Sequence, residues 1–313
     1  MSRVAVLKGG RSLERQVSLN SGARVEESLR RLGHTVIEVD VGHDLVDRLA
    51  AERPDVAFVV LHGRDGEDGT VQELLEVLDI PYTGSRVSAC ILASDKVLAK
   101  HAMRGAGIPT PDFFAFSETA FRSLGAAQAL PAISTRLKFP IVVKPASQGS
   151  ALGIKFAQSA SDVPTALIAA FSYDRKVLLE RYVAGRELAV SVLEDGGDGP
   201  RALPIVEAVP EQESFYDFES RYEIGRTRFI CPAELDDGVA ARVQALAVQA
   251  FELLGCSVFA RVDLMLDAET LEPYVLEVNP IPGLTETSLL PQAADAAGIG
   301  FDELISRIVS AAA

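Results

Sequence analysis

The alternation of short apolar segments with amphipathic helical segments over the first 85 residues constrains the fold of this chain most. Residues 3–10 and 34–41 have the composition of strands, and residues 55–63 (DVAFVVLHG) are apolar almost without interruption. A strand that is apolar on both faces is typical of a parallel sheet covered by helices. Helices are predicted over 18–33 and 70–79. We therefore predict a parallel α/β domain whose ligands bind at the C-terminal ends of its strands.

The pattern changes after a proline-punctuated linker at residues 107–113. Strands are predicted in four further segments, 139–157, 176–195 (broken at Ala184-Gly185), 259–267 and 274–279, and helices at 88–104, 237–255 and 301–312. Residues 259–267 and 274–279 read as an antiparallel pair. The fold class predicted is therefore α/β plus α+β, with antiparallel units after the parallel start.

Charge and cysteine content exclude several classes of protein. The net charge of −14 argues against a nucleic-acid partner, which a basic patch would normally bind. No apolar run is long enough to span a bilayer, and the N-terminus lacks an apolar core of signal-peptide length. Cys90, Cys231 and Cys256 are widely spaced, which favours free thiols in a reducing compartment. We expect a cytoplasmic protein with neither membrane nor nucleic-acid partners.

A strand ending LEVNPIPG presents Glu277 and Asn279 on one face before two prolines stop it. In the strand before it, Arg261 and Asp263 also share a face. If the two strands pair, Asp263, Glu277 and Asn279 converge as a set of oxygen ligands suited to Mg²⁺. The alternatives are a structural Arg261–Asp263 ion pair and a solvated strand end in which Asn279 enters a turn.

Two other segments carry candidate binding residues. Lys144 closes the strand PIVVK before the Gly/Ser loop PASQGSALG, an arrangement that can hold phosphate oxygens, although a strand-end lysine can also be merely solvated. His62 begins the loop HGRDGEDG at the end of an apolar strand, where α/β sheets bind ligands. The alternative for His62 is an exposed residue in a polar turn.

The motifs together, in their order, resemble those of the D-alanine–D-alanine ligase family. They run over essentially the whole chain as VLKGGRSLERQVSLNSG, LHGRDGEDGTVQELLEVLDIPYTGS, ASDK, VVKPASQGSALGI, LLERYVAGRELAV, FYDFESRY, FARVDLML and LEVNPIPGLTETSLLP. The resemblance implies an ATP-grasp fold in three parts: an N-terminal substrate domain (1–93), a central domain (94–187) and a C-terminal domain (188–313) that carries a lid at 209–229. It also implies a homodimer.

The resemblance implies a ligase that joins two D-alanines for peptidoglycan precursor synthesis. The carboxylate of the first D-alanine attacks the γ-phosphate of ATP, and the amine of the second attacks the resulting acyl phosphate. The family motifs assign ATP contacts to Lys96, Lys144, Glu180, Glu187 and Arg221. They assign Mg²⁺ to Asp263, Glu277 and Asn279, with two ions expected and Mn²⁺ able to substitute.

The remaining roles that the resemblance implies concern the two amino acids. Glu14 is expected to bind the first amino group, with Ser150 and Tyr222 linking it to the lid. Arg261 and the Gly283 N–H are expected to stabilise the oxyanion. His62 is expected near the first carboxylate, and Ser288 and Leu289 are expected to bind the second.

This chain departs from the family pattern at a few positions. Arg221 replaces a lysine in the lid, Lys8 replaces an aromatic residue, Arg15-Gln16 replaces His-Glu, and the expected metal-binding strand is followed by NPIPG where the family commonly has Asn-Thr.

Three alternative functions stay open. They are a ligase of the same mechanism with another acceptor (D-serine, D-lactate or another amino acid), a catalytically silent nucleotide-binding paralogue, and a Mg²⁺ hydrolase outside this fold.

Overall fold

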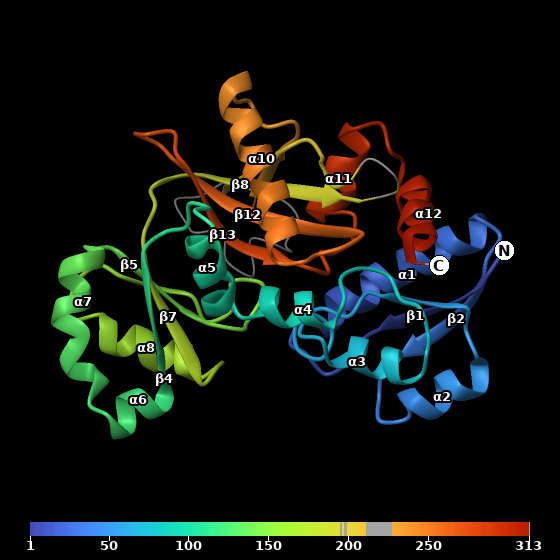
Figure 1. Cartoon of the computed structure of the whole chain (residues 1–313), viewed down its shortest axis with the longest axis horizontal. Helices are drawn as coiled ribbons and strands as arrows, with labels where there is room; N and C mark the ends of the chain where they lie inside the picture. Colours follow the sequence, from blue (N-terminus) through green and yellow to red (C-terminus); the bar gives the residue numbers. More distant parts are fainter. Residues whose placement is uncertain (195, 197–198, 211–226, 313) are drawn as a thin grey trace.

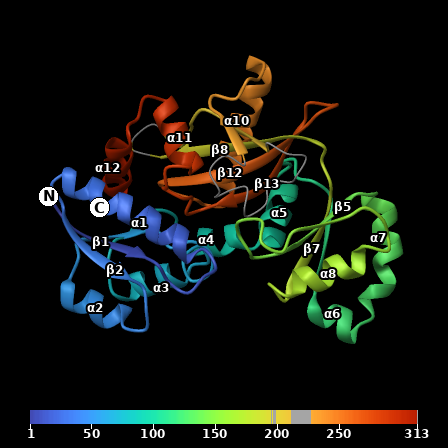
Figure 2. The same ribbon diagram turned by 180° about the vertical axis from the view of Figure 1, so that it is seen from behind.

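The computed structural model describes residues 1–194, 196, 199–210 and 227–312, and within them three β-sheets. In Figure 1 the N-terminal sheet and the middle sheet lie at opposite ends of the molecule, and the third sheet lies beside both. Figure 2 shows the same arrangement from behind, with α4 and α5 between the two end sheets. No helix in this described part of the chain is long and apolar enough to cross a membrane.

The N-terminal sheet is parallel and covered on both faces. Its strands lie in the order β2 (Thr35–Asp40), β1 (Arg3–Lys8), β3 (Val56–Val59). The helices are α1 (Arg15–Arg31) and α12 (Phe301–Ala312) on one face and α2 (Leu45–Glu52) and α3 (Thr70–Val77) on the other. Alternate residues of β1 enter the two cores, Val4 and Val6 one and Ala5 and Leu7 the other. The strand predicted at 55–63 to be buried on both faces is confirmed, since Val56 and Phe58 enter the first core and Ala57 and Val59 the second.

The middle sheet is antiparallel, as predicted. Its strands lie in the order β4 (Phe113–Ser117), β7 (Lys176–Arg181), β5 (Ile141–Pro145), β6 (Lys155–Ala157). The segment also holds α6 (Glu118–Ser123), the short 3-10 helix η1 (Ala126–Ala129), α7 (Leu130–Leu137) and α8 (Val163–Phe171). Ile141, Val143 and Leu179 pack against α7 and α8. The other face of the sheet is therefore left for Lys144 and Glu180, which alternate with these residues.

The third sheet carries the predicted antiparallel pair. Its strands lie in the order β11 (Thr227–Ile230), β10 (Val206–Pro210), β8 (Gly185–Leu193), β12 (Phe259–Asp267), β13 (Pro273–Asn279), and β9 (Arg201–Ala202) pairs with β8. Helix α10 (Asp237–Leu253) covers one face and α11 (Leu289–Ala296) the other. The pairing sets Asp263 opposite Glu277 and Arg261 opposite Asn279, so the predicted convergence at this strand end is confirmed.

Two of the predicted helices differ most from the observed ones. The helix predicted over 88–104 is two helices, α4 (Val87–Ser94) and α5 (Lys96–Gly105). Asp95 separates them because its backbone is extended and its carboxylate caps the new helix by accepting from Val97 N–H and Leu98 N–H. The helix predicted from residue 18 begins at Arg15 instead. Ser18 does not cap it, since its hydroxyl accepts from Gly9 N–H and donates to the Val60 carbonyl.

The C-terminal helix returns to the N-terminal sheet. Arg31 of α1 donates two hydrogen bonds to Asp302 of α12, at 2.9 and 2.6 Å, and the two chain ends lie close together in Figure 1. Helices α2, α6, α7, α8 and α11 and strand β4 did not emerge from the sequence patterns. The division at residues 93/94 and 187/188 stays a prediction, and most of the predicted lid lies outside the described residues.

Candidate active site

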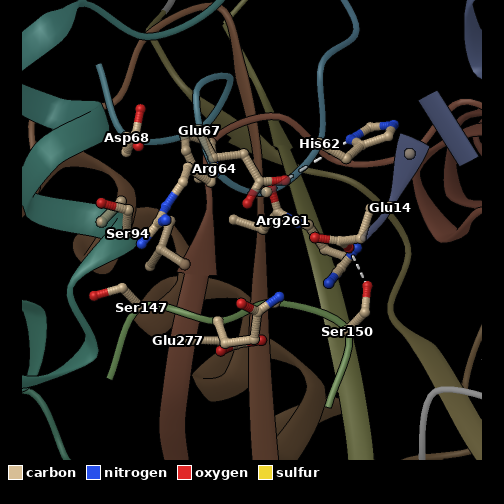
Figure 3. A pocket seen from close by; sticks show the side chains of 18 of the residues that line it. Glu14, His62, Arg64, Glu67, Asp68, Ser94, Ser147, Ser150, Arg261 and Glu277 are labelled. Atoms are coloured by element: carbon tan, nitrogen blue, oxygen red, sulfur yellow. Dashed lines mark hydrogen bonds and ion pairs between the residues drawn. The ribbon is translucent and has the colours of Figure 1, made fainter. Parts of the chain in front are cut away.

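The main cavity lies where the strand ends of the first and third sheets meet the β5–β6 loop. Its volume is about 290 Å³. Figure 3 looks into it and shows side chains from elements far apart in sequence pointing toward one another. Ten predicted site residues line it: Glu14, His62, Lys96, Ser150, Arg261, Glu277, Asn279, Gly283, Ser288 and Leu289. Residues predicted from separate motifs therefore form one site.

Glu14 directs a buried carboxylate into this cavity from the start of α1. The residue is 4% exposed, Ser150 Oγ donates to its Oε1, and its Oε2 has no hydrogen-bond partner among the described residues. Burial, and then the charge of Glu67, raises the pKa of Glu14 above its ordinary value. Gly63 and Gly149 leave the space for it, since a Cβ would lie 2.6 and 3.0 Å from Oε2. An unpaired buried carboxylate oxygen suits a ligand ammonium group.

His62 is a buried part of the cavity wall rather than exposed in a turn. Its Nδ1 lies 3.1 Å from the Ile281 carbonyl, which can only accept, so Nδ1 carries a proton. Its Nε2 lies 3.3 Å from Ser21 Oγ, and that same oxygen accepts from Leu284 N–H at 3.1 Å. His62 and Ser21 thus attach the loop that contains Gly283 to the N-terminal sheet and α1.

The loop after β13 supplies the opposite wall. A Cβ on Gly283 would lie 2.6 Å from Ser288 Oγ, so a larger residue there would displace the Ser288 hydroxyl. Ser288 lies directly before α11 and bonds back to Thr285, whose N–H donates to Ser288 Oγ at 3.0 Å. Ser288 and Leu289, at the N-terminus of α11, both line the cavity. A helix N-terminus of this kind binds carboxylates.

The carboxylates at the end of the β12–β13 pair are matched with cations. Asp263 receives two hydrogen bonds from Arg261, and Glu277 lies 2.9 Å from Lys96 Nζ. Asn279 Oδ1 accepts from Ile281 N–H at 2.9 Å, the turn contact considered above as an alternative. The ion pair and the turn that the alternatives describe therefore exist, Arg261, Glu277 and Asn279 line the main cavity, and the metal site stays a prediction.

A smaller cavity of about 50 Å³ adjoins the first and shares Lys96, Gln148 and Glu277 with it. Lys144, Glu187 and Asp263 also line it. Lys96 is the first residue of α5, where the backbone N–H groups already favour an anion. Burial lowers the pKa of Lys96, but the nearby carboxylates outweigh burial and raise it, so this amine stays charged. The smaller cavity is therefore suited to phosphate oxygens.

Glu180 has a different position from the other predicted residues. It is 2% exposed and lines neither cavity. Its carboxylate is held between Lys144 and Lys100. Sequence patterns did not single out Lys100, although it follows Lys96 by four residues and so lies on the same helix face.

The residues around the smaller cavity fit a magnesium ion that is coordinated partly by the protein and partly by phosphate oxygens. Among the described residues, no group of three or more His, Cys, Asp and Glu side chains could hold a metal alone. Asp263 and Glu277 face each other across the strand pair with the Asn279 amide nearby. Two carboxylates and an amide are hard ligands of the kind Mg²⁺ accepts, and phosphate oxygens and water complete its coordination.

Two predicted site residues lie outside the part of the chain that the structure describes, and the sequence did not single out several residues that line the cavity. Arg221 and Tyr222 lie outside the described residues. Lys8 pairs with Glu26 and Arg15 with Asp40, and neither residue lines either of the two cavities described above. The cavity wall also includes Arg64, Glu67, Asp68, Ser94, Ser147 and Gln148. The loop HGRDGEDG had been considered only for its histidine.

Comparison with known proteins identifies the family. The C-terminal region of the D-ala D-ala ligases matches residues 102–310, and the N-terminal region matches residues 43–85. The D-alanine–D-alanine ligase of Moorella thermoacetica is 43% identical over 99% of both chains, and that of Syntrophotalea carbinolica is 45% identical over 99% of this chain and 96% of its own. A solved D-alanine–D-alanine ligase from Bacillus anthracis, complexed with ATP, is 32% identical with a TM-score of 0.82 and covers 100% of this chain and 97% of its own.

The three sheets and the cavity between them define a ligase of the ATP-grasp fold. The chain belongs to the D-alanine–D-alanine ligase family. The family, fold class and enzyme class predicted from the sequence are confirmed.

Proposed function

We propose that the two adjoining cavities hold two D-alanines and the phosphates of Mg-ATP, and that the protein joins the amino acids into D-alanyl-D-alanine. The observation that carries this proposal is the unpaired, buried Oε2 of Glu14 in a cavity that Arg261 and Lys96 also line. Such a site offers a carboxylate to an ammonium group and cations to a carboxylate or phosphate. This polarity matches an amino acid whose carboxylate points toward a nucleotide.

The first D-alanine is assigned to Glu14 and Arg261. Glu14 binds its ammonium group and leaves the carboxylate near Arg261, beside the smaller cavity. One carboxylate oxygen attacks the γ-phosphorus of ATP, the bond from phosphorus to the ADP oxygen breaks, and an acyl phosphate forms. Positioning and charge neutralisation supply the catalysis, since phosphoryl transfer needs little covalent help from a protein.

ATP is assigned to Lys96, Lys144, Glu187 and Glu180, a proposal supported by the ATP complex of the Bacillus anthracis relative. Lys96 and Lys144 bind phosphate oxygens in the smaller cavity. Asp263, Glu277 and Asn279 would hold Mg²⁺, or Mn²⁺ in its place, and two ions are proposed. A bound ion of this kind would neutralise charge on the phosphates.

The second D-alanine is assigned to the N-terminus of α11. Ser288 and the Leu289 N–H bind its carboxylate, and its free amine attacks the carbonyl carbon of the acyl phosphate. The tetrahedral oxyanion is stabilised by Arg261 and the Gly283 N–H. Collapse expels phosphate and leaves the peptide bond, while the amine proton leaves with phosphate or water. The roles of Ser150, His62, Tyr222 and Arg221 remain those that the family resemblance implies.

Isotope transfer tests the proposed route. D-Alanine labelled with ¹⁸O in both carboxylate oxygens is incubated with ATP and Mg²⁺, and the inorganic phosphate is analysed by mass spectrometry. One ¹⁸O atom per phosphate is expected, because the attacking oxygen leaves with phosphorus. Unlabelled phosphate would overturn the acyl-phosphate route. Substituting D-serine, D-lactate or L-amino acids for the acceptor separates this function from a ligase with another acceptor.

We also propose that the protein acts in the cytoplasm as a homodimer, in three domains bounded at residues 93/94 and 187/188. ATP and the three free cysteines support the compartment, and the family resemblance supports the dimer. Sedimentation equilibrium measures the assembly directly: a mass of about twice the chain mass of 33.4 kDa is expected.

A further inference from the structure

Glu180 lies between two buried lysines that come from different elements. Lys144 of β5 approaches its Oε1 at 2.7 Å, and Lys100 of α5 pairs with its Oε2. Lys100 is 0% exposed, Glu180 2% and Lys144 5%. We call this group the Lys100–Glu180–Lys144 triad. It carries two positive charges and one negative charge, so one positive charge is not balanced within it.

The two lysines differ in what else they contact. Lys144 lines the smaller cavity. Lys100 lines neither cavity; its Nζ donates to Thr110 Oγ1 at 2.5 Å, and that hydroxyl donates to the Val275 carbonyl at 2.8 Å. Lys100 is therefore held away from the cavities with its charge directed at Glu180. Only Lys144 can present the unbalanced charge to a ligand.

Burying a lysine so deeply is unfavourable unless a counter-charge is present. Burial lowers the pKa of Lys100 to about 8 although Glu180 opposes the shift. Burial would raise the pKa of Glu180, but the two lysines outweigh it and lower that pKa, so the carboxylate stays ionised. Glu180 therefore needs a cation at all times, whichever lysine supplies it.

We propose that Lys100 is a positioning residue for nucleotide binding: it neutralises Glu180, so that Lys144 is free to bind a phosphate of ATP. Without Lys100, Glu180 and Lys144 form a neutral buried pair, and a phosphate must compete with Glu180 for the only remaining amine. The inference rests on the proposed function, in which Lys144 contacts the phosphates.

Charge-changing variants test this arrangement. Lys100→Met removes the neutralising charge, and the double variant Lys100→Met/Glu180→Gln restores a triad with one positive charge on Lys144. The dissociation constants of Mg-ATP and of Mg-tripolyphosphate are measured by calorimetry at pH 7. Tripolyphosphate lacks adenosine, so it reports on the phosphate contacts alone. Both constants are expected to rise at least tenfold in Lys100→Met, and the constant for Mg-tripolyphosphate is expected to return to within about threefold of wild type in the double variant.

Controls separate this role from a purely structural one. Lys138→Met removes an exposed lysine that lines neither cavity, so it should leave both constants unchanged. If Lys100→Met does not fold, Lys100→Gln, which retains a donor for Thr110, replaces it with the same expected loss. A folded Lys100 variant with wild-type tripolyphosphate affinity would overturn the inference, as would a double variant no better than the single. Failure of the wild-type protein to bind Mg-ATP would instead overturn the proposed function.

Discussion

Arg261 and Asp263, two residues apart on β12, are joined by two parallel hydrogen bonds of 2.7 Å each. Arg261 lines the larger cavity and Asp263 the smaller, so the pair lies at the junction between the proposed amino-acid and nucleotide sites. The guanidinium is oriented by this contact at the edge of the larger cavity. A lysine cannot reproduce such a two-pronged geometry.

Arg261→Lys is therefore expected to lower kcat by roughly 10²-fold with little change in KM for ATP, because the lost contact is made to the oxyanion. Steady-state phosphate release measures both constants. Arg307→Lys alters a surface arginine paired with Glu303 of the same helix and should behave as wild type. Equal loss in both variants, or a loss confined to KM, would contradict the assigned role.

Glu14→Gln should lower activity while stabilising the empty protein. The raised pKa of Glu14 means that the folded state keeps its proton in a pH window, above 4.5, where the unfolded state has lost it. Stability consequently falls as pH rises through that window, so this group makes the wild type less stable at pH 7 than at pH 4.5. Glutamine removes this cost and can still accept from Ser150.

The measurement is thermal unfolding without ligands at pH 7 and at pH 4.5. A higher Tm for Glu14→Gln at pH 7, with a smaller difference at pH 4.5, is expected, together with a loss of activity of about 10²-fold or more. A variant less stable than wild type at pH 7 would show that Glu14 supports the fold rather than awaiting a ligand.

Asp95→Ala should weaken ATP binding through Lys96. Asp95 caps α5 and pairs with Lys176, so its loss frays the turn that begins with Lys96. We expect KM for ATP to rise about 10-fold and stability to fall by about 1 kcal/mol. Ser117→Ala removes the cap of α6, far from the cavities, and provides the control: it should lower stability alone. If Asp95→Ala also changes stability alone, the cap does not position Lys96.

Ser21→Ala tests whether the loop around Gly283 must be anchored. The Ser21 hydroxyl connects His62 with Leu284 N–H, one residue beyond Gly283. Its loss frees that backbone, and kcat is expected to fall roughly 10-fold because the oxyanion donor is less well placed. Ser134→Ala, a helix serine bonded only to its own helix, is the matched control. Unchanged kcat in Ser21→Ala would contradict the anchoring role.

The pairing of β12 with β13 was well predicted from the sequence because the pattern of both strands has a period of two. Arg261, Asp263, Glu277 and Asn279 alternate with apolar residues, so pairing of the two strands leaves few registers, and the observed one brings all four together. The parallel start was equally predictable, since β1 and β3 are apolar on both faces. The alternation of apolar and polar residues along the chain was therefore sufficient to predict these strands.

Residues that act through distant partners could not be predicted in this way. Lys100 and Glu180 are 80 positions apart, and only the packing of α5 against the middle sheet joins them. The same holds for Ser21 with Leu284 and for Glu67 beside Glu14. The break between α4 and α5 was missed because Asp95 interrupts a sequence that is otherwise favourable for a helix. Tertiary contacts, rather than local preference, decide such positions.

The most direct test of the account is phosphate release from Mg-ATP by the purified protein with D-alanine as the only amino acid. The account predicts phosphate release that depends on D-alanine and an equal amount of D-alanyl-D-alanine, identified by mass. L-Alanine should not replace the D-isomer. Nucleotide binding without phosphate release for any D-amino acid tested, or phosphate release without dipeptide, would contradict it.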